Sequence, residues 1–427
     1  MSQPKKLKSL HRDLRQAPSK IEGLFKVTDF NRLLSAAIST SNDVSKNKQY
    51  SLESEIKVGI LSVLTKSESQ RDFSSRLDLN PNWLKICNLS NGAPHQTTLS
   101  RWWNDERLLE PLENLFLRLQ DLISLKRLRN ETKVTKSLEK YYNKNYQLLA
   151  IDSSVINLSP RKYKYVKKVY RGVPHEEAFG ARLHLLIDLF NGYPVNYIPS
   201  GANEHDSPYA NVLIDNWVDN EKYWLKKDNR KNLKPLITAD RGYWNKDRFL
   251  NWTNRNILFI TPKKKRTLTN CQIEFENFPN ESTNQIQGSI WFPQNTQSFR
   301  MIFTKTNRSN VKWLETITND HNLSGNDIVK IYSKRWLIEE EFKWIKQHLI
   351  LQNPLTTSWT GLVVHLYLVL ILFCLLLYFI ALLQINQWEL VISNIWIQLT
   401  SDPTVEWTFS FLNDYLLILS VIQEDQK

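Results

Sequence analysis

The stretch from Leu362 to Leu383, LVVHLYLVLILFCLLLYFIALL, contains a single strongly polar side chain, that of His365. Such a segment must form a helix that either crosses a bilayer or is enclosed by other elements of the protein. It is long enough to span a membrane, but the mean hydropathy of the chain is −0.42 and no second run resembles it. We therefore predict a helix buried near a sheet, and a membrane protein is the alternative.

The charge balance indicates a polyanionic partner. Among 427 residues, 56 Lys and Arg stand against 43 Asp and Glu, which gives a formal net charge of +13. A chain of this length is expected to form two or three domains. Because the basic residues are spread along the sequence, nucleic acid is favoured over an anionic membrane surface.

The cysteines and the N-terminus indicate a reducing, cytoplasmic location. Cys87, Cys271 and Cys374 are far apart in the sequence, which argues against a disulfide framework and against a zinc site built from cysteines. Residues 1–20 are basic but lack the apolar core of a signal peptide, and we interpret them as an N-terminal arm.

Residues 21–140 have the apolar spacing of helices. In SNGAPHQTTLSRWWND, Thr97 or Thr98 is predicted to cap a helix that carries Arg101, Trp102 and Trp103. This pattern fits any helical bundle. The basic context favours a helical DNA-binding domain.

From about residue 145 the sequence changes to short apolar runs, and two of these end in an acid. YQLLAIDSS carries Asp152 and KPLITADRGYW carries Asp240. Between them, RLHLLIDLFNGYPVNYIPS contains two strand-like runs joined by Asn191-Gly192, a strong hairpin signal. Functional sites in open α/β sheets gather beyond the carboxyl ends of strands, so we expect the two aspartates to converge. Either could instead cap a helix.

Other polar residues of this region are weaker candidates for a site. Asp188 and Asp206 are interpreted as structural or supporting acids, and His184 and His205 lack the spacing of metal ligands.

Three further β-like runs, ILFITPKKKR, GSIWFP and FRMIFTKT, predict a strand-rich insertion over about 257–322. A cluster of cations near its start, formed by Lys263, Lys264, Lys265 and Arg266, is a candidate for phosphate contacts, although many charge runs only face solvent. Ser324 and Asp327 predict the start of a helix.

The stretch IYSKRWLIEEEFKWIKQH, residues 331–348, can be analysed as one helix with about 100° per residue. Five side chains then share a stripe about 80° wide: Tyr332, Arg335, Glu339, Lys343 and Lys346. An adjacent apolar stripe would dock the helix on the core, and Glu340 and Glu341 would point outward. An ordinary ion-pair ladder also explains Arg335, Glu339 and Lys343, but not Tyr332 or the two strand-end aspartates.

The spacing of Tyr332, Arg335, Glu339 and Lys346 resembles the Y-x2-R-x3-E-x6-K signature of DDE-type insertion-sequence transposases, the group founded by insertion sequence four. AIDSS, HLLIDLFNGYPVNYIPSGANEHD and ITADRGYW are similar to the first-acid strand, the following hairpin and the second-acid strand of that family. The resemblance covers about 145–350. The serines after Asp152 replace the Gly-Thr of many relatives, which leaves the acid itself unaffected.

The resemblance implies an α/β fold with a ribonuclease-H-like catalytic core over 141–385, a β-rich insertion, an all-α N-terminal region, and a helical C-terminal region over 386–427. It implies that Asp152, Asp240 and Glu339 are catalytic and hold two Mg²⁺ ions, for which Mn²⁺ can substitute. The implied partner is double-stranded DNA, bound by a homodimer at the terminal inverted repeats. The implied reaction is cut-and-paste cleavage and strand transfer through hairpin ends.

The family further implies that Tyr332, Arg335 and Lys346 grip the distorted DNA end. Lys343, Arg241 and the cations at 263–266 are additional DNA-contact candidates. Trp336 could stack on an unstacked base, although core packing is the commoner role of a tryptophan. A domesticated DNA-binding protein or a nuclease on the same scaffold is the alternative function.

Overall fold

The computed structural model describes residues 20–40, 49–67, 69–126, 133–142, 144–163, 165–169, 178–228, 233–263, 272–275, 285–291, 297–305, 313–349, 351, 354 and 356–383. The predictions for the N-terminal arm, for 386–427 and for Lys264, Lys265 and Arg266 lie outside these residues. The chain divides into two compact units, residues 1–119 with 367–427, and residues 120–366.

Only helices occur before residue 143 in the described part of the chain. They are α2 (Lys20–Val27), α3 (Phe30–Ser39), α4 (Leu52–Leu64), α5 (Gln70–Asp78), α6 (Pro81–Ile86), α7 (Gln96–Trp103), η1 (Glu106–Leu108), α8 (Leu109–Lys126) and α9 (Lys133–Tyr142). Helix α7 starts at least two residues earlier than the predicted caps allow. Its N-cap is His95, whose ring Nδ1 accepts a hydrogen bond from the Thr97 amide at 3.4 Å, so the prediction of Thr97 or Thr98 is wrong.

The second unit is built on a ten-stranded mixed sheet. The strands are β1 (Tyr146–Asn157), β2 (Lys167–Val169), β3 (Ala178–Asp188), β4 (Tyr193–Gly201), β5 (Lys234–Ala239), β6 (Leu258–Pro262), β7 (Gln272–Phe275), β8 (Gln285–Trp291), β9 (Ser298–Lys305) and β10 (Trp313–Thr318). The order is β2-β3-β1-β5-β6-β10-β9-β8-β7, and β4 also pairs with β3. Strands β1, β5 and β6 are parallel, and the other pairs are antiparallel.

Several local predictions for the sheet are confirmed. Strands β3 and β4 form the predicted hairpin, and Gly192 has the positive φ of 66° that favours glycine in such a turn. The three β-like runs form β6, β8 and β9.

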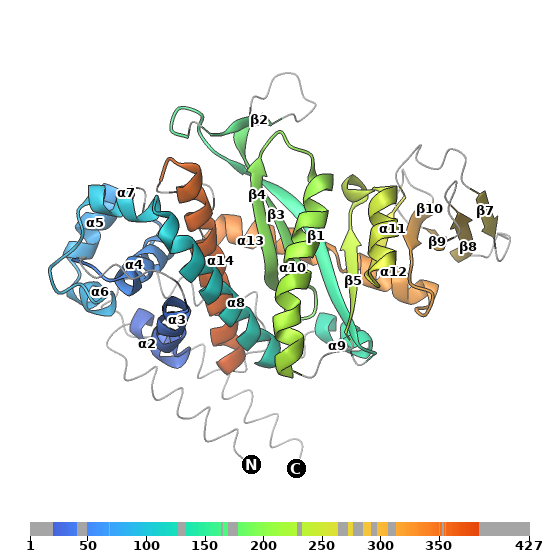
Figure 1. Ribbon diagram of the computed structural model, residues 1–427, viewed down its shortest axis with the longest axis horizontal. Helices are drawn as coiled ribbons and strands as arrows, with labels where there is room; N and C mark the ends of the chain where they lie inside the picture. The colour runs from blue at the N-terminus through green and yellow to red at the C-terminus, as the bar shows by residue number, and fades with distance from the viewer. Residues whose placement is uncertain are drawn as a thin grey trace, which may run out of the picture. The chain divides into compact units, whose positions relative to one another are not determined.

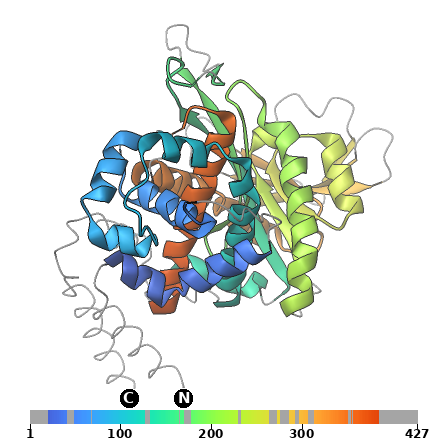
Figure 2. The ribbon, with the colours of Figure 1, turned by 60° about the vertical axis from the view of Figure 1, so that its left-hand side comes forward.

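Helices α10 (Asp206–Asp228) and α13 (Trp336–His348) cover opposite faces of the sheet (Figure 1), and the turned view shows the same arrangement (Figure 2). The alternation of side chains along β1 agrees, because successive residues of a strand point to opposite faces. Asp152 and Ser154 are hydrogen-bonded to residues near or within α13, whereas Ser153 contacts Asp206 at the start of α10. Shorter helical elements near the sheet are η2 (Arg241–Tyr243), α11 (Lys246–Asn254) and α12 (Gly325–Ser333).

The apolar stretch forms α14 (Trp359–Leu383), which is mostly buried, so the prediction of an enclosed helix is confirmed. By length and composition alone it could also span a membrane, and it is the only helix of the described chain that could. Its beginning lies near the sheet, where the Tyr197 hydroxyl of β4 donates to the Val363 carbonyl at 3.5 Å. Farther along, Leu368 packs so closely on α4 that a Cβ on Gly59 would lie 2.8 Å from its Cδ1.

Candidate active site

Asp152 and Asp240 lie next to each other on parallel strands. Ile151 of β1 pairs with Ala239 of β5, so the aspartates that follow occupy neighbouring positions. Asp240 directly follows β5, as predicted. Asp152 is not at a strand end, because β1 continues to Asn157 in antiparallel pairing with β3, and its predicted strand-end position is therefore wrong.

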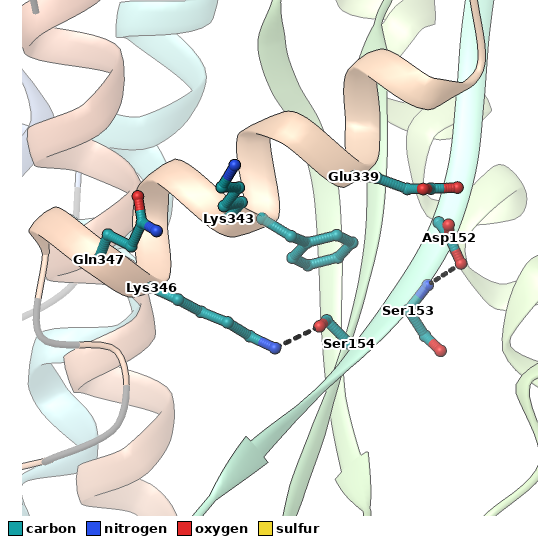
Figure 3. A pocket seen from close by; sticks show the side chains of 8 residues that line it. Asp152, Ser153, Ser154, Glu339, Lys343, Lys346 and Gln347 are labelled. Carbon is teal, nitrogen blue, oxygen red and sulfur yellow. Dashed lines mark hydrogen bonds between the residues drawn. The ribbon is translucent and has the colours of Figure 1, made fainter.

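Arg335 connects Asp152 with Glu339. Its guanidinium donates from Nη1 to Asp152 Oδ2 at 2.8 Å and from Nη2 to Glu339 Oε1 at 2.5 Å. The side chains of Arg335 and Asp152 are 16% and 18% exposed, whereas that of Glu339 is 56% exposed. Figure 3 shows the Glu339 carboxylate pointing toward Asp152 from the helix above β1. Two acids that are far apart in the sequence thus share one cation.

The charges of two further carboxylates act on Asp152. Burial raises the pKa of Asp152 to about 6; Arg335 opposes that shift, and the charges of Asp240 and Glu339 add to it. The contribution of both other acids means that Asp240 and Glu339 lie close enough to Asp152 to repel it through a poorly hydrated environment. Such a cluster is a site for cations and is common at catalytic centres.

A pocket of about 400 Å³ opens beside these acids. Figure 3 shows it between β1 and α13. It is lined by Asp152, Ser153, Ser154, Glu339, Phe342, Lys343, Lys346 and Gln347. Lys346 donates from Nζ to Ser154 Oγ at 2.5 Å, while the Lys343 ammonium points away from β1. The pocket therefore combines acids at one end with two cations at the other.

A family model described as "Transposase DDE domain" matches residues 143–375, more than half of the chain and all of the elements that form this pocket. The chain belongs to the DDE transposase family. A curated relative, "Probable transposase for insertion sequence element IS5377" from Geobacillus stearothermophilus, is 22% identical over 208 residues, which are 47% of this chain and 48% of the relative. The chain thus spans about half the length of that relative.

A solved structure, "Cryo-EM structure of piggyBac transposase synaptic complex with hairpin DNA (SNHP)", is 11% identical and has a TM-score of 0.41, with 94% of this chain and 85% of that chain covered. Similarity at this level supports no argument about function.

The other predicted DNA contacts of the transposase occupy different environments. Tyr332, at the end of α12, is half-buried, and burial raises its pKa while the nearby cations Arg335 and Arg241 lower it. Arg241 is exposed in η2. Trp336 is 43% exposed, so the more common expectation of core packing is wrong for it. Lys263 is ion-paired with Glu315 Oε2 at 2.6 Å, and this pairing partly neutralises its charge.

Residues 331–349, predicted to form a single helix, belong to two helices. The prediction is also wrong about the orientation of one glutamate. Helix α12 ends at Ser333, and α13 begins at Trp336. Glu340 is exposed as predicted, but Glu341 is only 3% exposed, so its predicted outward orientation is wrong. Glu341 is buried because a second part of the protein covers this side of α13. The turn between β3 and β4 lies against α13, and a Cβ on Gly192 would be 3.5 Å from Glu341 Oε1.

The opposite face of β1 carries a polar network that the sequence did not predict. Asp206 Oδ1 accepts hydrogen bonds from Ser153 Oγ at 2.5 Å and from Arg182 Nη1 at 2.7 Å. His184 is fully buried and bonded to Ser200 Oγ at 2.8 Å, in line with a structural role, while His205 is exposed. The alternation of β1 and β3 could have placed Ser153 and Arg182 on one face.

Asp188 lies in the hairpin rather than in the pocket. Its Oδ1 accepts hydrogen bonds from the amides of Phe190 and Asn191 at 2.9 and 2.7 Å, which fixes the turn between β3 and β4. This contact agrees with the structural interpretation.

The carboxylate oxygens of the pocket are suitable ligands for a hard cation, because Mg²⁺ prefers such oxygens. Among the described residues, no three His, Cys, Asp or Glu side chains converge closely enough to hold an ion as they stand. Arg335 lies between Asp152 and Glu339, where its guanidinium supplies the positive charge. A metal ion shared by these two acids would have to displace that guanidinium.

Proposed function

We propose that this chain is the cut-and-paste transposase of an insertion-sequence element related to insertion sequence four. It binds the terminal inverted repeats and carries out metal-dependent strand cleavage and strand transfer with Asp152, Asp240 and Glu339. The observation that carries this proposal is the convergence of the three acids: strand pairing places Asp240 beside Asp152, and Arg335 bonds both Asp152 and Glu339. Tyr332, Arg335 and Lys346, the other members of the signature, lie at or beside the same pocket.

We propose that β4, β3, β1, β5 and β6 form a ribonuclease-H-like core and that β7 to β10 are the β-rich insertion before α13. The insertion was predicted to begin at about residue 257, but β6 pairs in parallel with β5 and is therefore assigned to the core. The parallel pairing of β1 with β5 supports this, because it brings the first two acids together. The third acid then comes from a helix packed on the face to which Asp152 points.

Two Mg²⁺ ions, or Mn²⁺ in their place, would be held by Asp152, Asp240 and Glu339 and would stabilise the attacking and leaving oxygens of a phosphodiester displacement. The protein itself contributes the position of each carboxylate. Asp240 is fixed through Oδ1 by the Gly242 amide at 2.7 Å, and Asp152 through Oδ1 by the Ser153 amide at 2.8 Å. The second oxygen of Asp240 is therefore kept for a cation, whereas Oδ2 of Asp152 is held by Arg335, which a metal ion would have to displace.

Cations around the pocket would bind the DNA. Lys346 and Lys343 line it, and Arg241 is exposed next to Asp240. Exposed Trp336 suits stacking on a base displaced at a hairpin end. Synapsis of two ends would involve a homodimer in the bacterial cytoplasm, where the buried thiols of Cys87 and Cys374 would remain reduced.

The test compares neighbouring glutamates of α13. Glu339→Gln keeps the shape of the side chain but removes its charge, so cleavage of DNA carrying the terminal repeats in Mg²⁺ should fall at least about a thousandfold, roughly 4 kcal/mol of transition-state stabilisation. Glu340→Gln is the matched control, because Glu340 is exposed and should cleave within about tenfold of the wild type. Both variants should still bind the ends. Undiminished cleavage by Glu339→Gln would refute the assignment.

A further inference from the structure

The connection from β1 to β2 is rich in cations and contains no acid. Between Asp152 and Glu176 the sequence has six Lys or Arg and no Asp or Glu, and tyrosines stand among the cations in RKYKYVKKVYR. We refer to residues 161–169 as the basic segment. Three cations of this segment are exposed in the described part of the chain: Arg161, Lys162 and Lys167.

Two tyrosines hold the basic segment in place. Tyr163 is only 2% exposed and donates its hydroxyl to the Pro354 carbonyl at 2.6 Å. Tyr165 packs edge-on against Trp359, with 5.5 Å between ring centroids. The Tyr163 amide also bonds the Ser159 carbonyl at 2.9 Å, which closes a turn. The anchored tyrosines leave the neighbouring cations at the surface.

Two of the exposed cations form no ion pair with a described acid, although Glu204 and Lys167 both lie close to Gly201. In the described part of the chain, neither Arg161 nor Lys167 forms an ion pair with Asp or Glu, and Lys162 lies over the Tyr163 ring with Nζ 5.1 Å from its centroid. Unpaired guanidinium and ammonium groups attract phosphates without a cost for breaking existing ion pairs.

The basic segment continues the strand that carries the pocket. Asn157, the last residue of β1, is about 17 Å along the strand from Asp152 at about 3.3 Å per residue. About five base pairs of duplex cover the same length. Strand β2, which belongs to the basic segment, pairs with the beginning of β3 at the outer end of the sheet (Figure 1). DNA engaged at the pocket could therefore reach it.

We propose that the basic segment is a second DNA-binding surface that grips the phosphate backbone of duplex DNA several base pairs from the acids through Arg161, Lys162 and Lys167. The proposal rests on the proposed function for its partner. The contacts are to phosphates, so the surface binds without sequence preference and positions the duplex instead of reading it.

The test uses two charge-matched double variants of the full chain. Arg161→Ala with Lys167→Ala removes two cations of the basic segment. Lys144→Ala with Lys234→Ala removes two exposed cations near the opposite ends of β1 and β5. Affinity for a 40-base-pair duplex of arbitrary sequence is measured in EDTA at several salt concentrations, so that neither cleavage nor the terminal repeats enter. Circular dichroism verifies folding.

The first variant should reduce the slope of log affinity against log salt by about 1.8 and weaken binding at 0.1 M salt by more than about tenfold. The Lys144 and Lys234 variant should bind like the wild type. Equal behaviour of the two variants would overturn the proposal. If the wild type binds this duplex but does not cleave DNA that carries the terminal repeats in Mg²⁺, the proposed function fails while the basic segment is retained. If the wild type binds no DNA, both proposals fail.

A membrane arm of the same experiment uses phosphatidylserine vesicles, because an anionic bilayer also attracts Lys and Arg. Loss of vesicle binding in the Arg161 and Lys167 variant, together with unchanged DNA affinity, would assign the surface to a membrane and refute the DNA proposal.

Discussion

Glu341 is a buried acid whose replacement should stabilise the protein as the pH rises. It is 3% exposed, and in the described structure its Oε2 has no hydrogen-bond partner. Burial, followed by the charge of Asp188, raises its pKa well above the ordinary 4.5. The folded protein therefore keeps this carboxyl protonated at pH values at which the unfolded chain has released the proton.

The sign of the effect follows from that difference. Below about pH 4.5 the carboxyl is protonated in both states and contributes no pH dependence. Above it, the folded state binds the extra proton, so the free energy of unfolding falls by up to about 1.4 kcal/mol per pH unit until the folded pKa is reached. Glu341→Gln has nearly the same shape and no proton to release, so it removes this loss.

The assay is urea unfolding of the wild type, Glu341→Gln and Glu340→Gln between about pH 4.5 and 8.5. The infrared band of a protonated carboxyl measures the protonation state of Glu341 directly. The advantage of Glu341→Gln over the wild type should grow with pH, and the variant should lack the band. Exposed Glu340 is the control, and its variant should track the wild type. If the curve of Glu341→Gln stays parallel to that of the wild type, the carboxyl is not held protonated and the reasoning is refuted.

Two further predictions concern packing and ion pairing. Gly59→Val should lower the free energy of unfolding by about 2 kcal/mol or more, because the new Cβ would lie 2.8 Å from Leu368 Cδ1. In calorimetry, adding Leu368→Ala to this variant should recover part of the lost stability. If the effects of the two substitutions are fully additive, the contact is contradicted. Asp327→Asn should cost about 1 kcal/mol at pH 7, because burial raises the pKa of Asp327 but hydrogen bonds from Lys140 and Tyr141 outweigh it and lower the pKa to about 2. That stability is present above the ordinary 3.8 and is lost as the pH falls through about 2, so acid unfolding curves of wild type and variant should converge there.

The sequence by itself determined the local elements and the family of this protein. Asn191-Gly192 specified a hairpin because only certain residues adopt its backbone angles easily. Ser324 specified the start of α12, where its Oγ accepts from the Asp327 amide at 3.1 Å. The stretch from Leu362 to Leu383 specified an enclosed helix, because it has no polar face to turn toward water. The family followed from the order and spacing of the acids and cations.

The tertiary structure decided which of several similar side chains is buried or shared. The angular positions of Glu339, Glu340 and Glu341 around the helix predict which of them faces one surface, that of β1. They do not predict that the β3–β4 turn covers Glu341 from a second side. They also assume an unbroken helix, whereas the chain turns between Ser333 and Trp336.

Long-range pairing likewise decided the surroundings of Asp152. The sequence placed it at a strand end, but β3 prolongs β1 beyond it and brings Arg182 and Asp206 to the opposite face. Arg335 reaches Asp152 only because α13 packs on β1. Local signals arise from backbone angles and periodicity within a few residues, whereas burial and ion pairing depend on neighbours that are distant in the sequence and meet only when the chain is folded.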